Sequence, residues 1–263
     1  MLAQIVDAKR AELAGKSDAI LEEFYSTDCL PALRDFTGIF AIDNRVSLIA
    51  EIKRGSPVKG VFLAGVELAD LAVVYERNGA RAISVITEQN YFGGNPGLIR
   101  QVREQAELPV LRKDFIIDEC QVYESRLMGA DAVLLIARLL PGRLLRFVEL
   151  ACHLGLEPLV EVHDRAELEE ALDTPVRVIG INNRDLKDFT VDLRVSLDLI
   201  PLVPERIHCI AASGIRSRQD MKTLEENGFR GALVGEALVT ARDIGARVRE
   251  LAGYYEGAGY DQG

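Results

Sequence analysis

From Ser47 onward, short apolar runs alternate regularly with longer amphipathic runs, and no other feature constrains the fold as strongly. The short runs are rich in β-branched residues or leucine, as in buried parallel strands, and the longer runs are typical of helices. Several long runs end in glycine, as at Gly79, Gly129 and Gly228, where a left-handed cap can precede the next strand. The predicted strands are 47–53, 81–86, 109–113, 131–136, 157–162, 176–181, 206–211 and 230–235, and the predicted helices are 66–78, 96–106, 118–129, 141–154, 164–172, 194–200, 216–227 and 236–251.

Eight strand–helix units in succession predict a (β/α)8 barrel, the TIM-barrel architecture of the α/β class. A doubly wound open sheet is the competing arrangement. It is the weaker prediction because no Gly-x-Gly-x-x-Gly motif follows the first strand.

The chain is expected to have three parts: an N-terminal helical extension packing on the barrel (1–46), the barrel (47–252) and a flexible, glycine-rich tail (253–263). Within the extension, residues 1–27 are predicted to be helical and broken near Gly15, with Ser17 capping a second helix. Residues 31–44 are predicted to be irregular. The first helix has a stripe at helical spacing, formed by Leu2, Ile5, Val6, Lys9 and Leu13.

Charge and hydropathy exclude several classes of function. The 263 residues carry a formal net charge of −10 and contain no basic block, which argues against a nucleic-acid partner. No apolar run reaches the roughly 18 residues of a membrane span, and the first residues do not resemble a signal peptide. We therefore expect a cytoplasmic protein without membrane contacts.

The cysteines and histidines do not form a metal motif. The four cysteines lie far apart in the chain, which favours buried, reduced thiols in a cytosolic protein. His163 follows a predicted strand end that carries Glu161, which makes it a candidate metal ligand. It has no second ligand at metal-site spacing, so neither a metal nor a cofactor is expected.

Polar residues gather where the predicted strands end. Glu51 and Lys53 are two residues apart and so share one face of the first strand, opposite Leu48, Ala50 and Ile52. In a (β/α)8 barrel the carboxyl ends of the strands form one rim, where the chemistry takes place. The same rule places on that rim Lys113, Asp114, Phe115, Glu161, Asn182, Asn183, Arg184, Ser213, Gly214, Gly235 and Glu236. A structural ion pair is the alternative explanation for Glu51 and Lys53 alone.

Glycines in the last two predicted strand–helix loops indicate a phosphate site. Gly214 and Gly235 permit close approach of the backbone, and the helix predicted from Glu236 offers N–H groups and the positive end of its dipole. A turn glycine is the commoner explanation of each position by itself. The carboxylate of Glu236 would repel phosphate unless it points away.

Several segments resemble the signature segments of the indole-3-glycerol phosphate synthase family. They are Glu-Ile-Lys-Arg-Gly-Ser-Pro-Val-Lys-Gly (51–60), Thr-Glu-Gln-Asn-Tyr-Phe-Gly-Gly (87–94), Leu-Arg-Lys-Asp-Phe-Ile-Ile-Asp-Glu (111–119), Gly-Ala-Asp-Ala-Val-Leu-Leu-Ile (129–136), Leu-Val-Glu-Val-His (159–163) and Gly-Ile-Asn-Asn-Arg-Asp-Leu (180–186). The resemblance covers about residues 1–250. It implies conversion of 1-(2-carboxyphenylamino)-1-deoxyribulose 5-phosphate to indole-3-glycerol phosphate, CO2 and water in tryptophan biosynthesis, without a cofactor or metal.

The resemblance also implies roles for individual residues. Lys113 would be the general acid of ring closure, with a pKa lowered by neighbouring cations and with Lys53 as second cation. Glu51 and Glu161 would have acid–base and orienting roles, and Asn182 and Ser213 would position groups. The substrate is a small molecule bearing phosphate and carboxylate, and the oligomeric state expected is a monomer or weak homodimer. The implied binding residues are Phe92, Phe115 and Leu134 for the anthranilate ring, Ser56, Gly214 and Gly235 for phosphate, Arg184 for an anion, and Glu236 beside the phosphate loop.

One position departs from the family pattern. The family usually has Glu-Ser-Gly after the seventh strand, whereas this chain has Ala212-Ser213-Gly214. The missing carboxylate predicts reduced activity. It also leaves room for a barrel that binds a phosphate ligand or a partner without turnover, and another phosphosugar enzyme such as an isomerase is a further alternative.

Overall fold

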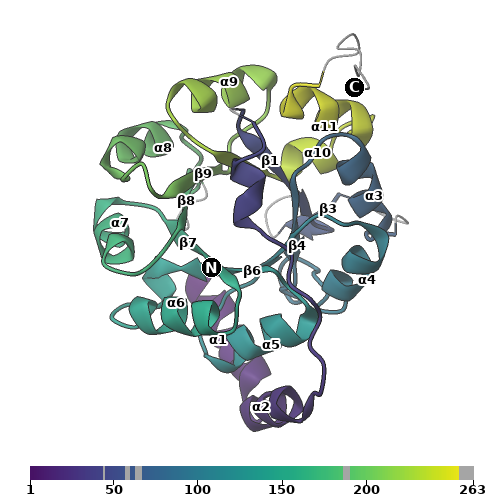
Figure 1. Ribbon diagram of the computed structural model, residues 1–263, viewed down its shortest axis with the longest axis vertical. Helices are drawn as coiled ribbons and strands as arrows, with labels where there is room; N and C mark the ends of the chain where they lie inside the picture. The colour runs from purple at the N-terminus through teal and green to yellow at the C-terminus, as the bar shows by residue number, and fades with distance from the viewer. Residues whose placement is uncertain (44, 57–59, 63–66, 186–189, 255–263) are drawn as a thin grey trace.

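The computed structural model describes residues 1–43, 45–56, 60–62, 67–185 and 190–254. Eight parallel strands close into a barrel that helices surround (Figure 1). The strands are β1 (Ser47–Ile52), β4 (Ala82–Ile86), β5 (Val110–Lys113), β6 (Ala132–Ile136), β7 (Glu157–Val162), β8 (Val178–Asn182), β9 (His208–Ala212) and β10 (Gly231–Val234). β1 pairs with both β4 and β10, which closes the ring and confirms the predicted TIM barrel.

The outer layer follows the predicted order of helices. Its members are α3 (Asp70–Arg77), α4 (Leu98–Gln105), α5 (Cys120–Met128), α6 (Leu144–His153), α7 (Arg165–Leu172), α8 (Arg194–Leu199), α9 (Arg218–Glu226), α10 (Glu236–Val239) and α11 (Ile244–Ala252), with short 3-10 turns η2 (Ala137–Leu139) and η3 (Ile200–Leu202). A two-stranded ribbon, β2 (Gly55–Ser56) and β3 (Gly60–Val61), lies between β1 and α3.

Strand residues alternate between two apolar cores, as the period of two in a strand requires. Leu48, Ala50 and Ile52 belong to the core between barrel and helices, whereas Ile49 belongs to the core inside the barrel. Glu51 therefore follows Ile49 on the inner face, as the sequence pattern predicts. At the carboxyl ends of the strands, the same alternation brings polar side chains such as Glu51 and Glu161 inward.

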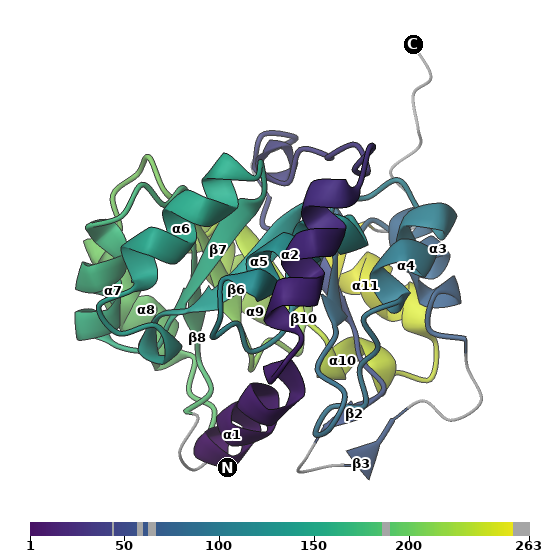
Figure 2. The same cartoon turned by 90° about the horizontal axis from the view of Figure 1, so that it is seen from below.

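The N-terminal segment runs along the outside of the barrel from one end to the other. Helix α1 (Leu2–Leu13) lies at the end that carries β2 and β3, and α2 (Ser17–Ser26) runs toward the opposite end (Figure 2). α2 packs on α5, where the rings of Phe24 and Tyr123 meet edge to face with centroids 4.9 Å apart.

A 3-10 turn, η1 (Thr37–Phe40), closes the end of the barrel where the strands begin. Phe36, Ile39 and Phe40 join the inner apolar core, and the Phe40 ring stacks on His208 with centroids 4.8 Å apart. A β-carbon on Gly231 would lie 3.0 Å from the Phe40 ring, so glycine suits the close approach there.

The structure corrects several local predictions. The helix predicted over 236–251 is two helices, because Asp243 accepts a hydrogen bond from the Ala246 N–H and starts α11 as a new helix. Ser17 is the first residue of α2 and not its cap, which is Lys16 without a side-chain cap bond. The irregular stretch 31–44 contains η1. The predicted tail beyond Tyr254 and the predicted helix start at residue 66 lie outside the described residues.

The four cysteines are free, but only two of them are buried. Cys120 and Cys209 are buried, whereas Cys29 and Cys152 are exposed, so the prediction of buried thiols is wrong for half of them. Both exposed cysteines lie on the outer surface, Cys152 within α6. Among the described residues, no helix is both long and apolar enough to cross a membrane.

Candidate active site

A cavity of about 470 Å³ opens at the carboxyl ends of the strands, the end that we call the mouth. Every residue with a catalytic or binding role predicted from the sequence lines it except Ser56, whose side chain is outside the described part of the chain. These lining residues are Glu51, Lys53, Phe92, Lys113, Phe115, Leu134, Glu161, Asn182, Arg184, Ser213, Gly214, Gly235 and Glu236. Side chains at the ends of β1, β5 and β7 thus gather two lysines and two glutamates around one space.

The first charged pair lies at the end of β1. Lys53 Nζ is 3.1 Å from Glu51 Oε1, and the ammonium lies 5.8 Å from the centre of the Phe62 ring. Glu51 is buried, and its carboxylate fills the space beside Gly235, where an added β-carbon would collide with Oε1. Gly235 therefore has a second reason to be glycine besides any approach of phosphate.

The second charged pair joins β5 to β7. Lys113 Nζ is 3.4 Å from Glu161 Oε2, and the Asn182 amide donates to Glu161 Oε1 at 3.0 Å. Burial alone would raise the pKa of Glu161, but Lys113 and then His163 outweigh it and hold that pKa below its ordinary value. Glu161 is therefore a carboxylate in this site.

The pKa of Lys113 is raised, which corrects the predicted lowering. Burial alone would lower this pKa, but the charges of Glu161 and Glu51 outweigh burial. The nearest charges are thus carboxylates and not the cations that the prediction assumed. Lys113 therefore keeps its proton and is available as a proton donor.

The segment after β9 holds an uncommon backbone conformation. Ser213 has φ 66°, and it is the one non-glycine residue with positive φ in the described part of the chain. The buried Asn183 side chain donates to the carbonyls of Ala212 and Ser213 at 3.1 and 3.0 Å. These bonds hold Ser213 against its steric preference and turn it toward the cavity.

Ala212 lies one residue before that turn and also lines the cavity. It pairs in register with Asn182 on β8 and Leu233 on β10. Asn182 in turn bonds Glu161. A longer side chain at position 212 would therefore enter the cavity close to the Glu161 pair.

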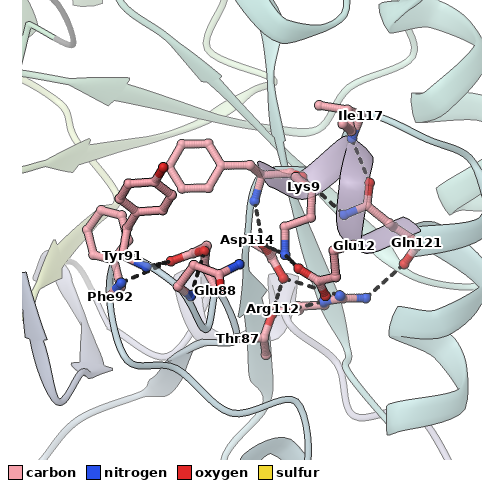
Figure 3. Close-up of polar contacts among 12 residues, drawn as sticks. Lys9, Glu12, Thr87, Glu88, Tyr91, Phe92, Arg112, Asp114, Ile117 and Gln121 are labelled. Carbon is pink, nitrogen blue, oxygen red and sulfur yellow. Dashed lines mark hydrogen bonds and ion pairs between the residues drawn. The ribbon is translucent and has the colours of Figure 1, made fainter. Parts of the chain in front are cut away.

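An apolar wall faces the charged pairs. The Phe92 and Phe115 rings lie with centroids 6.0 Å apart, and Leu134 adds to the lining from β6. The Glu88 carboxylate accepts the backbone N–H groups of Asn90, Tyr91 and Phe92 at 2.8–2.9 Å (Figure 3). Glu88 therefore fixes the loop that presents Phe92.

A buried ionic network connects the N-terminal helix to the mouth. Lys9 Nζ on α1 is 3.0 Å from Asp114 Oδ1, and these two side chains are 2% and 1% exposed (Figure 3). Asp114 also accepts from Thr87 at 2.6 Å and from Arg112 at 3.3 Å. Because Asp114 stands between Lys113 and Phe115, α1 is tied directly to the strand end that carries the cavity's central lysine.

The network sets the charge of both groups. Burial alone would raise the pKa of Asp114, but Arg112 and Lys9 outweigh it and lower that pKa. Burial alone would lower the pKa of Lys9, but the charges of Asp114 and Glu12 outweigh it and raise that pKa. The link between α1 and β5 is therefore an ion pair.

Some charged lining residues escaped the sequence prediction, namely Glu88, Arg216 and Arg247. Glu88 follows the second strand of the barrel, so the rule of strand ends would have found it. Arg216 lies two residues beyond Gly214, but Arg247 comes from α11 and has no local signal. Among the described residues, no group of three or more His, Cys, Asp and Glu side chains is arranged to hold a metal ion.

Comparisons with known proteins complete the description of the site. Residues 2–251 match the family described as indole-3-glycerol phosphate synthase. The indole-3-glycerol phosphate synthase of Chlorobaculum tepidum is 43% identical over 247 residues, covering 92% of this chain and 96% of that protein. The enzyme of the same name from Dehalococcoides mccartyi strain CBDB1 is 50% identical over 211 residues, covering 79% and 82%.

A solved structure supports the fold alone. The 3-hexulose-6-phosphate synthase of Salmonella typhimurium superposes with a TM-score of 0.64 at 16% identity, covering 80% of this chain and 98% of that one.

Proposed function

Because this chain belongs to the indole-3-glycerol phosphate synthase family, we propose that the residues around its mouth carry out that family's reaction. The reaction closes the pyrrole ring of 1-(2-carboxyphenylamino)-1-deoxyribulose 5-phosphate and releases CO2 and water, a step of tryptophan biosynthesis. The observation that carries the proposal is the pair of lysine–glutamate contacts, Lys53–Glu51 and Lys113–Glu161, around one cavity. The family match removes the support for an unrelated phosphosugar isomerase.

Lys113 is the proposed proton donor of ring closure. The ring carbon that bears the carboxylate forms a bond to the ketone carbon, and the ketone oxygen takes up the proton of Lys113. Loss of CO2 then returns the bonding electron pair to the ring. Because the pKa of Lys113 is raised, the group is fully protonated when the reaction begins.

The two glutamates are suited to the dehydration that follows. The new hydroxyl leaves as water once it is protonated, and loss of a proton from the carbon beside nitrogen completes the indole. Glu51 lies beside Lys53, and Glu161 lies beside Lys113, so each carboxylate has an ammonium within 3.4 Å with which to share a proton. Asn182 orients Glu161 through its 3.0 Å bond, and Ser213 contacts the substrate from its constrained turn.

The remaining lining residues bind the two ends of the substrate. Phe92, Phe115 and Leu134 provide an apolar wall for the anthranilate ring, and Arg184 holds an anion. The loops at Gly214 and Gly235, with Ser56, hold the phosphate. α10 is only four residues long and begins with Glu236, so backbone amides and not a long helix dipole carry this binding.

Ala212 predicts a lower turnover than is usual in the family. The position lies next to Ser213 and in register with Asn182, where a carboxylate would hold a lysine through a charge-assisted hydrogen bond. The groups assigned to bond making and breaking, Lys53, Lys113 and Glu161, are all present. We therefore propose an active enzyme, and the missing group affects orientation.

Turnover of the carboxyphenylamino substrate, followed by indole fluorescence, tests this function. Formation of indole-3-glycerol phosphate with equimolar CO2 is expected, and inorganic phosphate should compete with substrate by occupying the loops at 214–215 and 235–236. A protein that binds substrate without releasing CO2 would instead be a binding barrel. Absence of both binding and turnover contradicts the proposal entirely.

Several further properties remain our proposals. The substrate is small and anionic, and the five cations lining the cavity, Lys53, Lys113, Arg184, Arg216 and Arg247, suit its phosphate and carboxylate. We propose a monomer or weak homodimer in the cytoplasm, where four free cysteines stay reduced. We also propose that residues 1–46 form an N-terminal helical extension that packs on the barrel of residues 47–252.

A further inference from the structure

His163 is a buried group that the proposed chemistry leaves unused. It follows β7 two residues after Glu161, so both side chains emerge on the same side of the strand. Its side chain is 4% exposed. A buried histidine beside a reacting carboxylate needs a partner for each ring nitrogen that carries a proton.

Each ring nitrogen of His163 faces a carboxylate. Nδ1 lies 3.0 Å from Glu167 Oε2, which also accepts the His163 backbone N–H at 2.8 Å. Nε2 lies 3.5 Å from Glu161 Oε1 and has no hydrogen-bond partner among the described residues. The ring is therefore anchored on the α7 side, and its open nitrogen points at Glu161.

The charged groups around His163 alternate in sign from Arg138 at one side of the ring to Lys113 in the cavity. Glu167 accepts from Arg138 at 2.6 Å, and Arg138 also lies 3.8 Å from Asp164. Glu161 is paired with Lys113. Each carboxylate that faces the imidazole thus has its own cation, and the one beside Glu161 is the group assigned to give up its proton.

When Lys113 passes its proton to the ketone oxygen, the positive charge beside Glu161 is lost. A neutral imidazole donates from one nitrogen, whereas a protonated imidazole donates from both. The 3.5 Å separation is an ion-pair distance that a small side-chain movement shortens to a hydrogen bond. His163 can therefore donate a hydrogen bond to Glu161 when the charge of Lys113 is lost during ring closure.

We propose that His163 is a positioning residue that holds Glu161 as an aligned carboxylate while Lys113 is neutral, by donating from Nε2 to Glu161 Oε1. The inference rests on the proposed function, because it uses the proton transfer from Lys113. The proton from Lys113 goes to the ketone oxygen, and His163 takes no part in that transfer. No bond between heavy atoms forms at His163.

Two amide substitutions separate the two ring contacts. Asparagine places an amide nitrogen near the position of Nδ1, so His163→Asn keeps a donor for Glu167 and loses the reach to Glu161. Glutamine places one near Nε2, so His163→Gln keeps a neutral donor for Glu161. His153→Asn, at an exposed histidine that ends α6, is the matched control.

The substitutions at His163 should lower kcat and leave KM nearly unchanged. His163→Asn is expected to lower kcat about tenfold. This loss is smaller than the roughly 10²-fold that a 1 Å misplacement of a reacting group can cause. KM should change less than about twofold, and His163→Gln should recover roughly half of the loss on a logarithmic scale. His153→Asn should match the wild type.

Titration of Glu161 by ¹³C-carboxyl NMR in the free protein gives the deciding readout, because it needs no turnover. The facing imidazole helps to hold the pKa of Glu161 below its ordinary value, so the titration midpoint of Glu161 should move to higher pH in His163→Asn. A midpoint at the wild-type value, or equal kcat losses in the Asn and Gln variants, overturns the proposal. A wild-type protein without turnover refutes the proposed function, while the titration still decides the contact.

Discussion

The two ends of the barrel are built by opposite rules, although one N-terminal segment reaches both. At the end where the strands begin, Phe36, Ile39 and Phe40 fill the interior with apolar side chains. At the mouth the same segment contributes Lys9, a buried charge paired with Asp114. The closed end excludes water because apolar side chains fill it. At the mouth, buried charges are stabilised by pairing with opposite charges around a cavity. We therefore expect substitutions at the closed end to change stability and those at the mouth to change rate.

The largest effect is expected at Lys113. Lys113→Ala should lower kcat by roughly 10²–10⁴-fold, the usual contribution of a general acid, with little change in unfolding free energy. Lys222→Ala, at an exposed lysine of α9, is the control and should keep wild-type kinetics. Steady-state kinetics with circular dichroism measure both quantities. A loss under tenfold would remove Lys113 from its assigned role.

Phe40→Ala probes the closed end. The ring is 6% exposed and stacks on His208, so its removal leaves a cavity inside the barrel. The free energy of unfolding should fall by about 3–5 kcal/mol, as for other buried phenylalanines, while kcat of the folded protein stays within about twofold. Urea unfolding and kinetics at a temperature where the variant is folded check this. A large kcat loss with unchanged stability would contradict the division between the two ends.

Lys9→Met tests the buried ion pair with Asp114, through which the N-terminal segment contributes a paired charge to the mouth. It leaves Asp114 with Arg112 as its remaining cation, so the free energy of unfolding should fall by about 2 kcal/mol, less than for a buried charge left alone. Arg10→Met, on the same helix and 69% exposed, should cost under about 0.5 kcal/mol.

The stability difference between wild type and Lys9→Met should depend on pH. The pKa of Asp114 is lowered in the folded protein, so its contribution is present above the pKa of the unfolded chain and is lost as pH falls through the folded pKa. The difference should therefore shrink on acidification below the ordinary range of aspartate. A difference that stays constant on acidification below that range would mean that Lys9 acts through packing.

The smallest effect is expected at position 212, inside the mouth. Ala212→Glu should raise kcat by roughly tenfold, because it adds an orienting carboxylate, while KM stays similar or rises as negative charge enters an anion site. Ala212→Gln adds similar volume without charge and is the control. Should kcat stay level or fall in Ala212→Glu, the site has been rebuilt around alanine.

The fold was predictable from sequence because its signals are local. Each strand is a short apolar run closed by a turn, and the period of two already placed Glu51 inside and Ile52 outside. The rule of strand ends then collected most of the cavity lining. Such signals depend only on neighbours in the chain.

Contacts between distant segments were not predictable in this way. Lys9 occupies a position in an apolar stripe, which indicates burial, but its partner Asp114 is 105 positions away by residue number (114 − 9 = 105). The raised pKa of Lys113 depends on Glu161 and Glu51, which reach it from other strands. The break between α10 and α11 was missed although Asp243 is a good capping residue, because the apolar pattern continues across it.

The closure at Phe40 also sets an order of events during synthesis. Its partners His208 and Gly231 lie near the other end of the chain, so the ribosome releases Phe36 and Phe40 long before the surface that covers them exists. Contacts of such wide sequence separation form late and slow folding. A nascent chain therefore carries exposed phenylalanines until β10 is made, and it is during this interval that the protein is most open to aggregation and to chaperone capture.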